Sequence, residues 1–344
     1  MPLPSTLEKP APATRDARKQ ALVIGVDIGG TKVAAGLVDP ATGKILTHAK
    51  FPMKASGAAA QGLASVTSAI DQVLSSPLAR KSALGGIGLC APGPLDPLLG
   101  RILNPPNVPC WRDFDLADEI AKKYHLPVKV DNDANAAALA ETLWGAGLGY
   151  RSVFYVTIGT GIGTGIILNE RIYHGRTGLA AEGGHLSIDH RGPFCNCGKR
   201  GCIEVLAAGP AIAREARARL AANPILQSTI LDLADGNLEA ITTEMVGEAY
   251  ASGDALAVEV LQYTVDLLSF WLGNIIDLLE PEIIIVGGGV APILQPFFDD
   301  IRKLLRSYCV NPRGAEIPIV SSHYGADAGI AGGAALCSGS TFQK

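Results

Sequence analysis

Residues 23–39 read Val-Ile-Gly-Val-Asp-Ile-Gly-Gly-Thr-Lys-Val-Ala-Ala-Gly-Leu-Val-Asp, and this stretch decides the fold of the chain. Two apolar segments rich in valine flank a Gly-Gly-Thr turn, which predicts a strand, a tight turn and a second strand. Residues 153–169 repeat the pattern without a gap, with identical residues at the positions of Val23, Val26, Ile28 and Gly29. Since each copy opens one half of the chain, the repeat predicts two related halves.

The segments between and after these two hairpins alternate between strand and helix patterns. Strands are predicted at 45–51, 86–90, 128–130, 282–286 and 317–320, and helices at 58–74, 116–124, 134–144, 254–279 and 326–336. The apolar positions of the 254–279 segment step by three and four residues, which is typical of an amphipathic helix. This alternation predicts an α/β fold.

Length and charge narrow the classes of function. The 344 residues favour two domains of ordinary size. The formal net charge of -4 gives no electrostatic reason to bind a polyanion, so we expect no nucleic-acid partner. The uncharged run 152–169 has the length of a membrane span, but the glycines between Gly159 and Gly165 favour two strands and a turn. We therefore expect no membrane partner.

Cysteine usage and the N-terminus bear on location in the cell. Three of the seven cysteines lie within residues 195–202, a clustering that favours a reducing cytoplasm. Residues 1–20 mix proline, alanine and charges of both signs without an apolar core. This composition predicts a disordered tail and neither a signal peptide nor a transit helix. The sequence therefore predicts a cytoplasmic protein.

Three glycine-rich turns are candidate phosphate or nucleotide sites. The first, residues 27–32, places Asp27 at a strand end before a turn whose backbone N–H groups can cradle phosphate. The second, residues 159–165, adds threonine hydroxyls, and the third, Gly287-Gly288-Gly289, lets the backbone approach a base or ribose closely. Each turn taken alone is also typical of an ordinary hairpin or connection. Three in one chain favour a bound nucleotide.

The segment Asp-Asn-Asp-Ala-Asn at residues 131–135 ends a predicted strand and opens an alanine-rich helix. One of its short polar residues is expected to be the N-cap of that helix, but three caps are not needed. Asp133 is a candidate general base that takes a proton from a substrate hydroxyl. Asn132 offers both a donor and an acceptor to neighbouring hydroxyls.

A cysteine-rich segment predicts a metal site. Residues 195–202 read Cys-Asn-Cys-Gly-Lys-Arg-Gly-Cys, and His185 precedes them in Glu-Gly-Gly-His. Three thiols and one imidazole complete a tetrahedral zinc site with no position left for a catalytic water, so the metal is expected to be structural. The alternative is that these cysteines are small buried apolar residues. A metal here would fix the neighbouring carboxylates of Glu182 and Glu204.

Taken together these motifs resemble the ROK family of sugar kinases, within the actin-like, hexokinase and Hsp70 ATPase superfamily. The resemblance covers residues 23–336, and its most specific part is the cysteine segment after Glu-x-Gly-His. It implies an α/β fold with two actin-like (ribonuclease H-like) domains around a central cleft. The small N-terminal domain would comprise 21–134 plus 326–344, with the C-terminal helix returning to it. The larger domain would be 135–325 and contain the zinc-binding segment 182–204.

The resemblance also implies an activity, cofactors and site residues. The implied enzyme is an ATP-dependent glucokinase that phosphorylates the 6-hydroxyl of glucose, with Mg²⁺ and a structural Zn²⁺, and with Asp133 as the general base. The sugar-binding residues would be Asn107, Asn132, Asp133, Glu182, His185 and Glu204, with the Gly93 backbone. Nucleotide and Mg²⁺ would be bound by Asp27, Gly29, Gly30, Thr31, Lys32, Gly159, Thr160, Gly161, Gly287, Gly288 and Gly289. The zinc ligands would be His185, Cys195, Cys197 and Cys202.

Several alternatives share these motifs. Kinases of N-acetylmannosamine, N-acetylglucosamine, mannose, fructose or allose resemble this sequence as well, and polyphosphate is an alternative donor. Some ROK proteins are sugar-responsive repressors with a helix-turn-helix module, for which residues 1–20 are too few. A catalytically dead sugar sensor is the third alternative, although Asp133 and the glycine turns are present. The family implies a homodimer or a dimer of dimers.

One position departs from the pattern of the ROK family. Cys110 precedes Trp111 where the family pattern has glycine, which affects the details of the loop after Asn107. We expect the zinc segment to brace the sugar pocket at a distance from the glycine turns. Loss of zinc is therefore expected to disrupt sugar binding, while ATP binding survives better.

Overall fold

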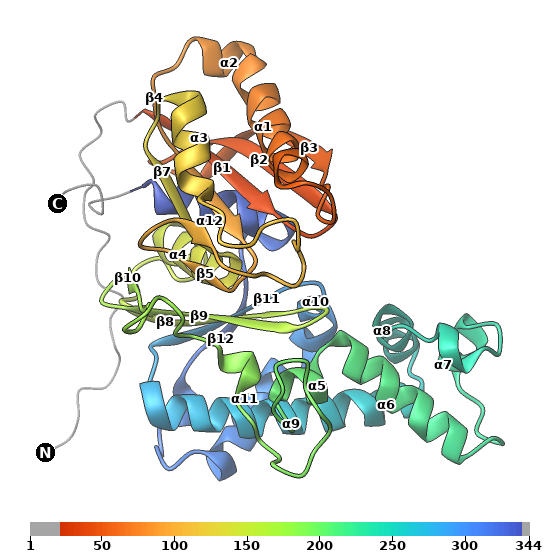
Figure 1. The fold of residues 1–344 in the computed structure, drawn as a ribbon. Coiled ribbons are helices and arrows are strands. Elements are labelled where there is room, and N and C mark those ends of the chain that lie inside the picture. Colours follow the sequence, from red (N-terminus) through yellow and green to blue (C-terminus); the bar gives the residue numbers. More distant parts are fainter. Residues whose placement is uncertain (1–20, 339–344) are drawn as a thin grey trace, which may run out of the picture. The chain divides into compact units, whose positions relative to one another are not determined.

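Two mixed five-stranded sheets form the framework of the protein in a computed structural model that describes residues 21–338 (Figure 1). The predicted tail, residues 1–20, lies outside the described residues. Contacts divide the chain into two units. Unit 1 holds the chain up to Val153, Gly165–Ala181 and the chain from Ser322, and unit 2 holds Phe154–Thr164 and Glu182–Ser321. The predicted α/β class is confirmed.

The sheet of unit 1 grows from the hairpin predicted at residues 23–39. Strands β1 (Leu22–Ile28) and β2 (Lys32–Asp39) pair antiparallel, and the sheet order is β3-β2-β1-β4-β7. The other members are β3 (Lys44–Pro52), β4 (Leu84–Ala91) and β7 (Val128–Asn132). Because β1, β4 and β7 run parallel, Asp27, Cys90 and Asp131 fall in register near the carboxyl ends of their strands. A small hairpin, β5 (Leu95–Asp96) and β6 (Arg101–Ile102), precedes β7.

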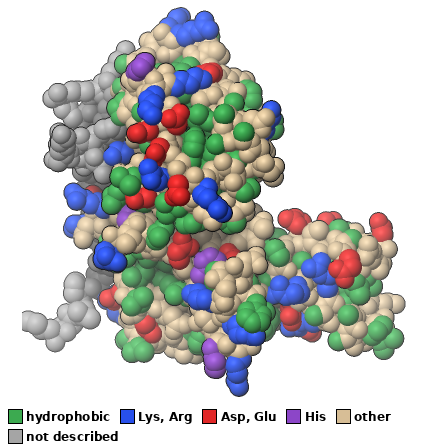
Figure 2. Space-filling view, in the orientation of Figure 1, with side chains coloured by type: hydrophobic (Ala, Val, Ile, Leu, Met, Phe, Trp, Pro, Cys, Tyr) green, Lys and Arg blue, Asp and Glu red, His purple; other side chains and the backbone are tan. Residues whose placement is uncertain are grey.

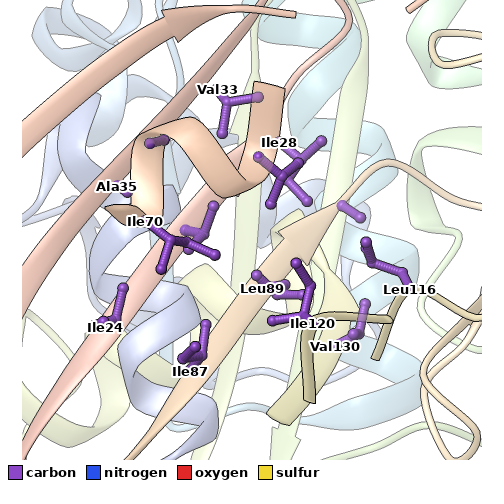
Figure 3. Close-up of a cluster of buried hydrophobic side chains, with 14 of the residues drawn as sticks. Ile24, Ile28, Val33, Ala35, Ile70, Ile87, Leu89, Leu116, Ile120 and Val130 are labelled. Atoms are coloured by element: carbon purple, nitrogen blue, oxygen red, sulfur yellow. The ribbon is translucent and has the colours of Figure 1, made fainter. Parts of the chain in front are cut away.

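Helices cover both faces of this sheet. On one face, α1 (Ala59–Ser75) and α3 (Leu116–Tyr124) enclose a core cluster with Ile24, Ile87 and Leu89 (Figure 3). The short α2 (Pro77–Arg80) follows α1. On the other face, α12 (Ala328–Leu336) packs on β1 and β4, and α4 (Asp133–Trp144) packs against α12. The C-terminal helix α12 thus packs on the sheet that contains the first hairpin.

The second sheet contains the predicted repeat of the first hairpin. Strands β8 (Ser152–Ile158) and β9 (Ile162–Leu168) flank the second glycine turn, and the sheet order is β10-β9-β8-β11-β12. The remaining strands are β10 (Arg171–Ile172), β11 (Ile283–Gly287) and β12 (Ile319–Ser321). Strands β11 and β12 pair parallel. Both copies of the repeat thus form a strand, a glycine turn and a strand.

The long helix α9 (Ala255–Leu279) is the central helix of unit 2. It contacts α5 (Ile203–Ala207), α6 (Gly209–Ala222), α8 (Thr243–Ala251) and α11 (Phe298–Tyr308). The shorter helices are α7 (Thr229–Leu233) and α10 (Ala291–Leu294). Within residues 21–338, α9 is the one helix long and apolar enough to cross a membrane, but over half of that apolar window is buried. Such burial is typical of a core helix.

Charges are mixed on the surface. On the face drawn in Figure 2, lysine and arginine side chains alternate with aspartate and glutamate. That face offers no continuous basic surface of the kind that nucleic-acid backbones require.

The predicted domain boundaries at 134/135 and 325/326 stay a prediction.

Candidate functional site

The first glycine turn lies in unit 1 beside the loop that carries Asn107. The Gly29 N–H donates to the carbonyl of Lys32 at 2.9 Å and closes the turn. A Cβ on Gly30 would lie 2.8 Å from the carbonyl oxygen of Asn107, so only glycine allows this approach. Thr31 and Lys32 are exposed. The structure therefore brings together a predicted phosphate turn and a predicted sugar-binding loop.

Asp27 is a mostly buried carboxylate at the end of β1. Burial and the negative charge of Asp133 raise the pKa of Asp27 to about 6, and Lys32 partly opposes this shift. The start of α12 packs directly on Asp27, because a Cβ on Gly329 would lie 2.4 Å from the carboxyl carbon of Asp27. The two predicted functional carboxylates, Asp27 and Asp133, both lie in unit 1, and the charge of Asp133 helps to raise the pKa of Asp27.

Asn132 and Asp133 occupy the junction between β7 and α4. Asn132 is the N-cap of α4, and its side-chain oxygen accepts from the Ala134 N–H at 2.9 Å. Asp133 begins the helix and accepts from the same N–H at 2.8 Å. The protein around Asp133 desolvates its carboxylate and raises its pKa, although part of the residue stays open to solvent. A raised pKa makes a carboxylate a better proton acceptor near neutral pH.

Asp131 supports this junction through a partner that sequence reasoning missed. Asp131 is 3% exposed, and its Oδ1 accepts from the Asn132 N–H at 2.7 Å and the Asn135 side chain at 3.1 Å. Its Oδ2 lies 2.6 Å from Nε2 of His174. No local spacing in the sequence predicts this hydrogen bond, because His174 is 43 residues away. Asp131 therefore holds the candidate base in place and does not itself face a substrate.

The second and third glycine turns lie together in unit 2. The Gly159 N–H donates to the Gly161 carbonyl at 2.9 Å, and the Gly209 N–H at the start of α6 donates to the Gly159 carbonyl at 2.8 Å. Gly288 has φ +88°, and a Cβ there would lie 2.3 Å from the carbonyl oxygen of Ile158. The Val290 N–H also donates to Ile158, at 3.0 Å. Two of the predicted nucleotide turns thus share one edge of the second sheet.

The predicted zinc ligands converge in unit 2. One ligand atom from each of His185, Cys195, Cys197 and Cys202 lies within 4.8 Å of the others. Nδ1 of His185 is 3.7 Å from the Cys195 sulfur, and the sulfurs of Cys197 and Cys202 are 3.6 Å apart. Ligands on a zinc tetrahedron at about 2.1–2.3 Å from the ion are separated by about 3.5–3.8 Å. The four side chains therefore fit a structural zinc ion.

Glycines and backbone hydrogen bonds shape the metal-binding loop. Gly198 and Gly201 have φ +89° and +61°, and a Cβ on Gly201 would lie 1.7 Å from the carbonyl oxygen of Asp189. The Cys195 N–H donates to the Lys199 carbonyl at 2.8 Å. The chain can fold back on itself this tightly only because these positions lack side chains.

The zinc segment also contacts the second glycine turn, which corrects one expectation. Oε2 of Glu204 accepts from the Ile162 N–H at 3.0 Å, and Oε1 lies 3.8 Å from the Cys195 sulfur. A Cβ on Gly161 would lie 2.5 Å from Oε2 of Glu204. The expectation that the metal site is distant from the glycine turns is therefore wrong. Sequence spacing could not reveal this, because Glu204 and Ile162 are 42 residues apart.

Trp111 anchors the loop in which Cys110 departs from the family pattern. Trp111 is 1% exposed, donates from Nε1 to the Ala59 carbonyl at 3.2 Å and stacks on Phe114 at 5.2 Å. The Cys110 N–H donates to the Ala55 carbonyl at 2.8 Å. Cys110 is therefore accommodated at the position where the family pattern has glycine.

The predicted sugar-binding residues fall into two groups, one in each unit. Asn107, Asn132 and Asp133 belong to unit 1. Glu182, His185 and Glu204 belong to unit 2, where the 3₁₀ turn Gly183–His185 and α5 carry them. The predicted nucleotide residues divide similarly, with 27–32 in unit 1 and 159–161 and 287–289 in unit 2.

Comparisons with known proteins identify relatives over nearly the whole chain. The sequence pattern of the ROK family matches residues 23–340. A glucokinase of Halalkalibacterium halodurans is 37% identical over 314 residues, which cover 90% of this chain and 93% of that protein. A ROK family glucokinase from Streptomyces griseus, solved in complex with glucose and AMPPNP, has a TM-score of 0.78 and 35% identity and covers 92% of this chain and 98% of its own.

Transcription regulators are related as well. A xylose repressor of Bacillus subtilis is 30% identical over 243 residues, which cover 71% of this chain and 58% of the repressor. Both kinds of relative match most of this chain, so the fold alone does not separate a kinase from a regulator.

Proposed function

The chain belongs to the ROK family, and from this premise we propose that it is an ATP-dependent hexose kinase whose preferred acceptor is the 6-hydroxyl of glucose. The products are glucose 6-phosphate and ADP. The observation that carries this proposal is the junction of β7 and α4, where Asp133 lies near Asp27 and beside the N-cap Asn132. The related glucokinases covered over nearly their whole length support the choice of glucose.

In this proposal Asp133 is the general base. Its carboxylate takes the proton of the 6-hydroxyl while the sugar oxygen forms a bond to the γ-phosphorus and the bond to ADP breaks. The raised pKa of Asp133 supports this role, since desolvation makes its carboxylate a stronger base. Asp131 and the helix-capping contacts of Asn132 hold the base in position.

The side chains that would recognise the sugar are those of Asn107, Asn132, Glu182, His185 and Glu204. Carboxylates, an imidazole and amides discriminate a hexose by paired hydrogen bonds to its hydroxyls. His185 places Nδ1 toward Cys195, which leaves its other ring nitrogen available for a sugar hydroxyl.

The glycine turns would bind ATP. Residues 27–32 and 159–161 supply backbone N–H groups for the phosphates, and 287–289 lie where adenosine can approach the backbone. Asp27 would hold Mg²⁺, which neutralises phosphate charge when bound. Zn²⁺ on His185, Cys195, Cys197 and Cys202 would supply local rigidity, and no step of the transfer passes through it.

The proposal extends to location and assembly. A reducing cytoplasm suits the four clustered zinc ligands and the free cysteines, and the family implies a homodimer. Related kinases act on other sugars, so N-acetylmannosamine, N-acetylglucosamine, mannose, fructose and allose are the alternative acceptors. The relation to a xylose repressor favours a second candidate, a sugar-responsive regulator.

A coupled assay of ADP release over a hexose panel tests the proposal. We expect turnover with glucose to exceed turnover with each alternative sugar, and little ATP hydrolysis without sugar. Turnover with N-acetylmannosamine alone would replace the glucose assignment. If no hexose is phosphorylated but the protein binds operator DNA in a sugar-dependent manner, the regulator is the correct function.

A further inference from the structure

The first residues of β9, directly after the second glycine turn, are held by both segments that carry zinc ligands. From one side, Glu204, two residues after Cys202, accepts the Ile162 N–H at 3.0 Å. From the other side, Gly184, one residue before His185, packs on the Ile162 carbonyl, where a Cβ would lie 1.9 Å from the oxygen. Residues next to zinc ligands thus contact both backbone polar groups of Ile162, with a hydrogen bond to its N–H and close packing on its carbonyl.

Thr164 adds a buried hydrogen bond to this contact. Its Oγ1 accepts from the Gly183 N–H at 2.8 Å, and Thr164 is 4% exposed. The Gly183 carbonyl in turn accepts from Nε1 of Trp271 at 3.1 Å. This hydroxyl therefore joins β9 to the segment that leads into the zinc ligand His185.

The opposite side of the turn is open. Thr160 is exposed, and a Cβ on Gly159 would meet nothing within 4 Å. Gly209 and Val290 bond the carbonyls of Gly159 and Ile158 at the start of the turn, and the zinc segment supplies the contacts to Gly161, Ile162 and Thr164. Backbone N–H groups bind phosphate well only when they are held in place beforehand, since otherwise binding must first order the turn.

We propose that the zinc segment, residues 182–204, positions the second glycine turn for nucleotide phosphates, with Glu204 and Thr164 as the positioning residues. Oε1 of Glu204 lies 3.8 Å from Nδ1 of His185, while its Oε2 lies against the turn. One carboxylate therefore connects the metal site to the phosphate turn. This inference rests on the proposed function, because it assumes that the turn binds the phosphates of ATP.

Thr164 gives the sharpest test, because it has no proposed contact with sugar or nucleotide. Thr164→Val keeps the shape of the side chain but leaves the Gly183 N–H without its acceptor, while Thr164→Ser keeps the hydroxyl. The binding of AMPPNP and of adenosine is measured by calorimetry on the full chain loaded with zinc. Thr164→Val removes a buried hydrogen bond that holds the turn, so AMPPNP binding must first order the turn. We therefore expect AMPPNP to bind about 5- to 10-fold more weakly to Thr164→Val.

The controls separate positioning from general damage. We expect adenosine affinity and zinc content of Thr164→Val to stay close to wild type, its thermal midpoint to fall by only a few degrees because of the unpaired Gly183 N–H, and Thr164→Ser to bind AMPPNP like wild type. Hydrogen exchange of a peptide covering residues 159–165 should be faster in Thr164→Val only. Unchanged AMPPNP affinity and exchange in Thr164→Val would overturn the inference, as would an equal loss of adenosine and AMPPNP binding.

Failure of the proposed function gives a different result. A wild-type protein that binds no AMPPNP fails as an ATP-dependent kinase before any variant is compared. A wild-type protein that binds AMPPNP and phosphorylates a hexose, but whose Thr164→Val variant is indistinguishable from it, keeps its function and refutes only the positioning role.

Discussion

At the residue scale, the candidate chemistry depends on two neighbouring carboxylates in different surroundings. Asp27 is mostly buried at the end of β1, and its pKa is raised to about 6. Asp133 begins α4 and is partly open to solvent, yet its pKa is raised as well. Asp27 is therefore suited to hold a cation, which favours its charged form, and Asp133 to accept a proton.

Asp133→Asn should lose turnover while it keeps binding sugar. Asparagine preserves the size and the helix-start position but cannot take the proton of the hydroxyl, so kcat should fall by about 10²- to 10⁴-fold. Steady-state kinetics and sugar calorimetry measure the two effects. Asp118→Asn, an exposed change on α3, is the matched control and should leave kcat unchanged. Retained turnover in Asp133→Asn would remove Asp133 as the base.

Asp27→Asn should change how stability depends on pH. The folded protein raises the pKa of Asp27 from 3.8 to about 6, so its protonated form is favoured on folding. The contribution of Asp27 to the unfolding free energy is fully present below pH 3.8, where its carboxyl is protonated. It is lost as pH rises through about 6, where the folded protein must carry the charge. Without nucleotide and magnesium, the unfolding free energy of wild type relative to Asp27→Asn should fall by up to about 3 kcal/mol over this range.

Urea unfolding at several pH values measures this difference. Asp118→Asn, whose carboxylate lies on the surface, should show the same pH dependence as wild type. A constant difference between wild type and Asp27→Asn from pH 4 to 7 would contradict the raised pKa.

At the element scale, the close packing of α12 on the first sheet depends on glycine. A Cβ on Gly25 of β1 would lie 1.9 Å from the carbonyl oxygen of Ile330, and one on Gly88 of β4 would lie 1.7 Å from that of Gly333. Alanine at either position would force the helix away from the sheet. The same helix packs on Asp27, so its position also affects the first phosphate turn.

Gly25→Ala should therefore destabilise the protein. The clash is with backbone and cannot be relieved by rotating a side chain, so we expect a loss of about 1–3 kcal/mol or more in the unfolding free energy. Gly85→Ala in β4 is the matched control, because its nearest contact would be an ordinary 3.5 Å. Equal denaturation midpoints in urea for the two variants would show that α12 can move without cost.

The zinc segment links two kinds of site within unit 2. Cys197→Ala removes one of four ligands, so bound zinc should be lost and sugar affinity should fall by about 10- to 100-fold. Because Glu204 and Gly183 of this segment hold β9, AMPPNP affinity should fall too. Metal analysis and calorimetry measure both effects. Cys110→Ala, outside the cluster, should keep zinc, and full zinc content in Cys197→Ala would exclude Cys197 as a ligand.

At the scale of the whole molecule, the chain repeats one supersecondary unit and uses each copy differently. The β1–β2 hairpin places a buried carboxylate before its glycine turn, whereas the β8–β9 hairpin has Thr157 at the corresponding position. In the β8–β9 hairpin the carboxylate beside the glycine turn comes instead from Glu204, outside the hairpin. The duplicated fold thus supplies two similar turns, and separate segments give each turn its own chemistry.

The sequence alone determined part of the strands and helices and the four residues of the candidate metal site. The β1–β2 and β8–β9 hairpins, helix α3 at Leu116–Tyr124 and the four zinc ligands were all predictable. Hydrophobic period, turn residues and ligand spacing are local properties, so they can be read along the chain. The N-cap role was predictable in kind, but only the structure assigned it to Asn132.

Only the tertiary structure decided which distant side chains meet. The pairs Asp131 with His174 and Glu204 with Ile162 join residues 43 and 42 positions apart, and Trp271 reaches Gly183 across 88. Such contacts depend on sheet order and on which loops lie at one edge of a sheet, and no local pattern encodes them. For the same reason the sequence predicted a zinc segment distant from the glycine turns, whereas the fold places Glu204 against the turn.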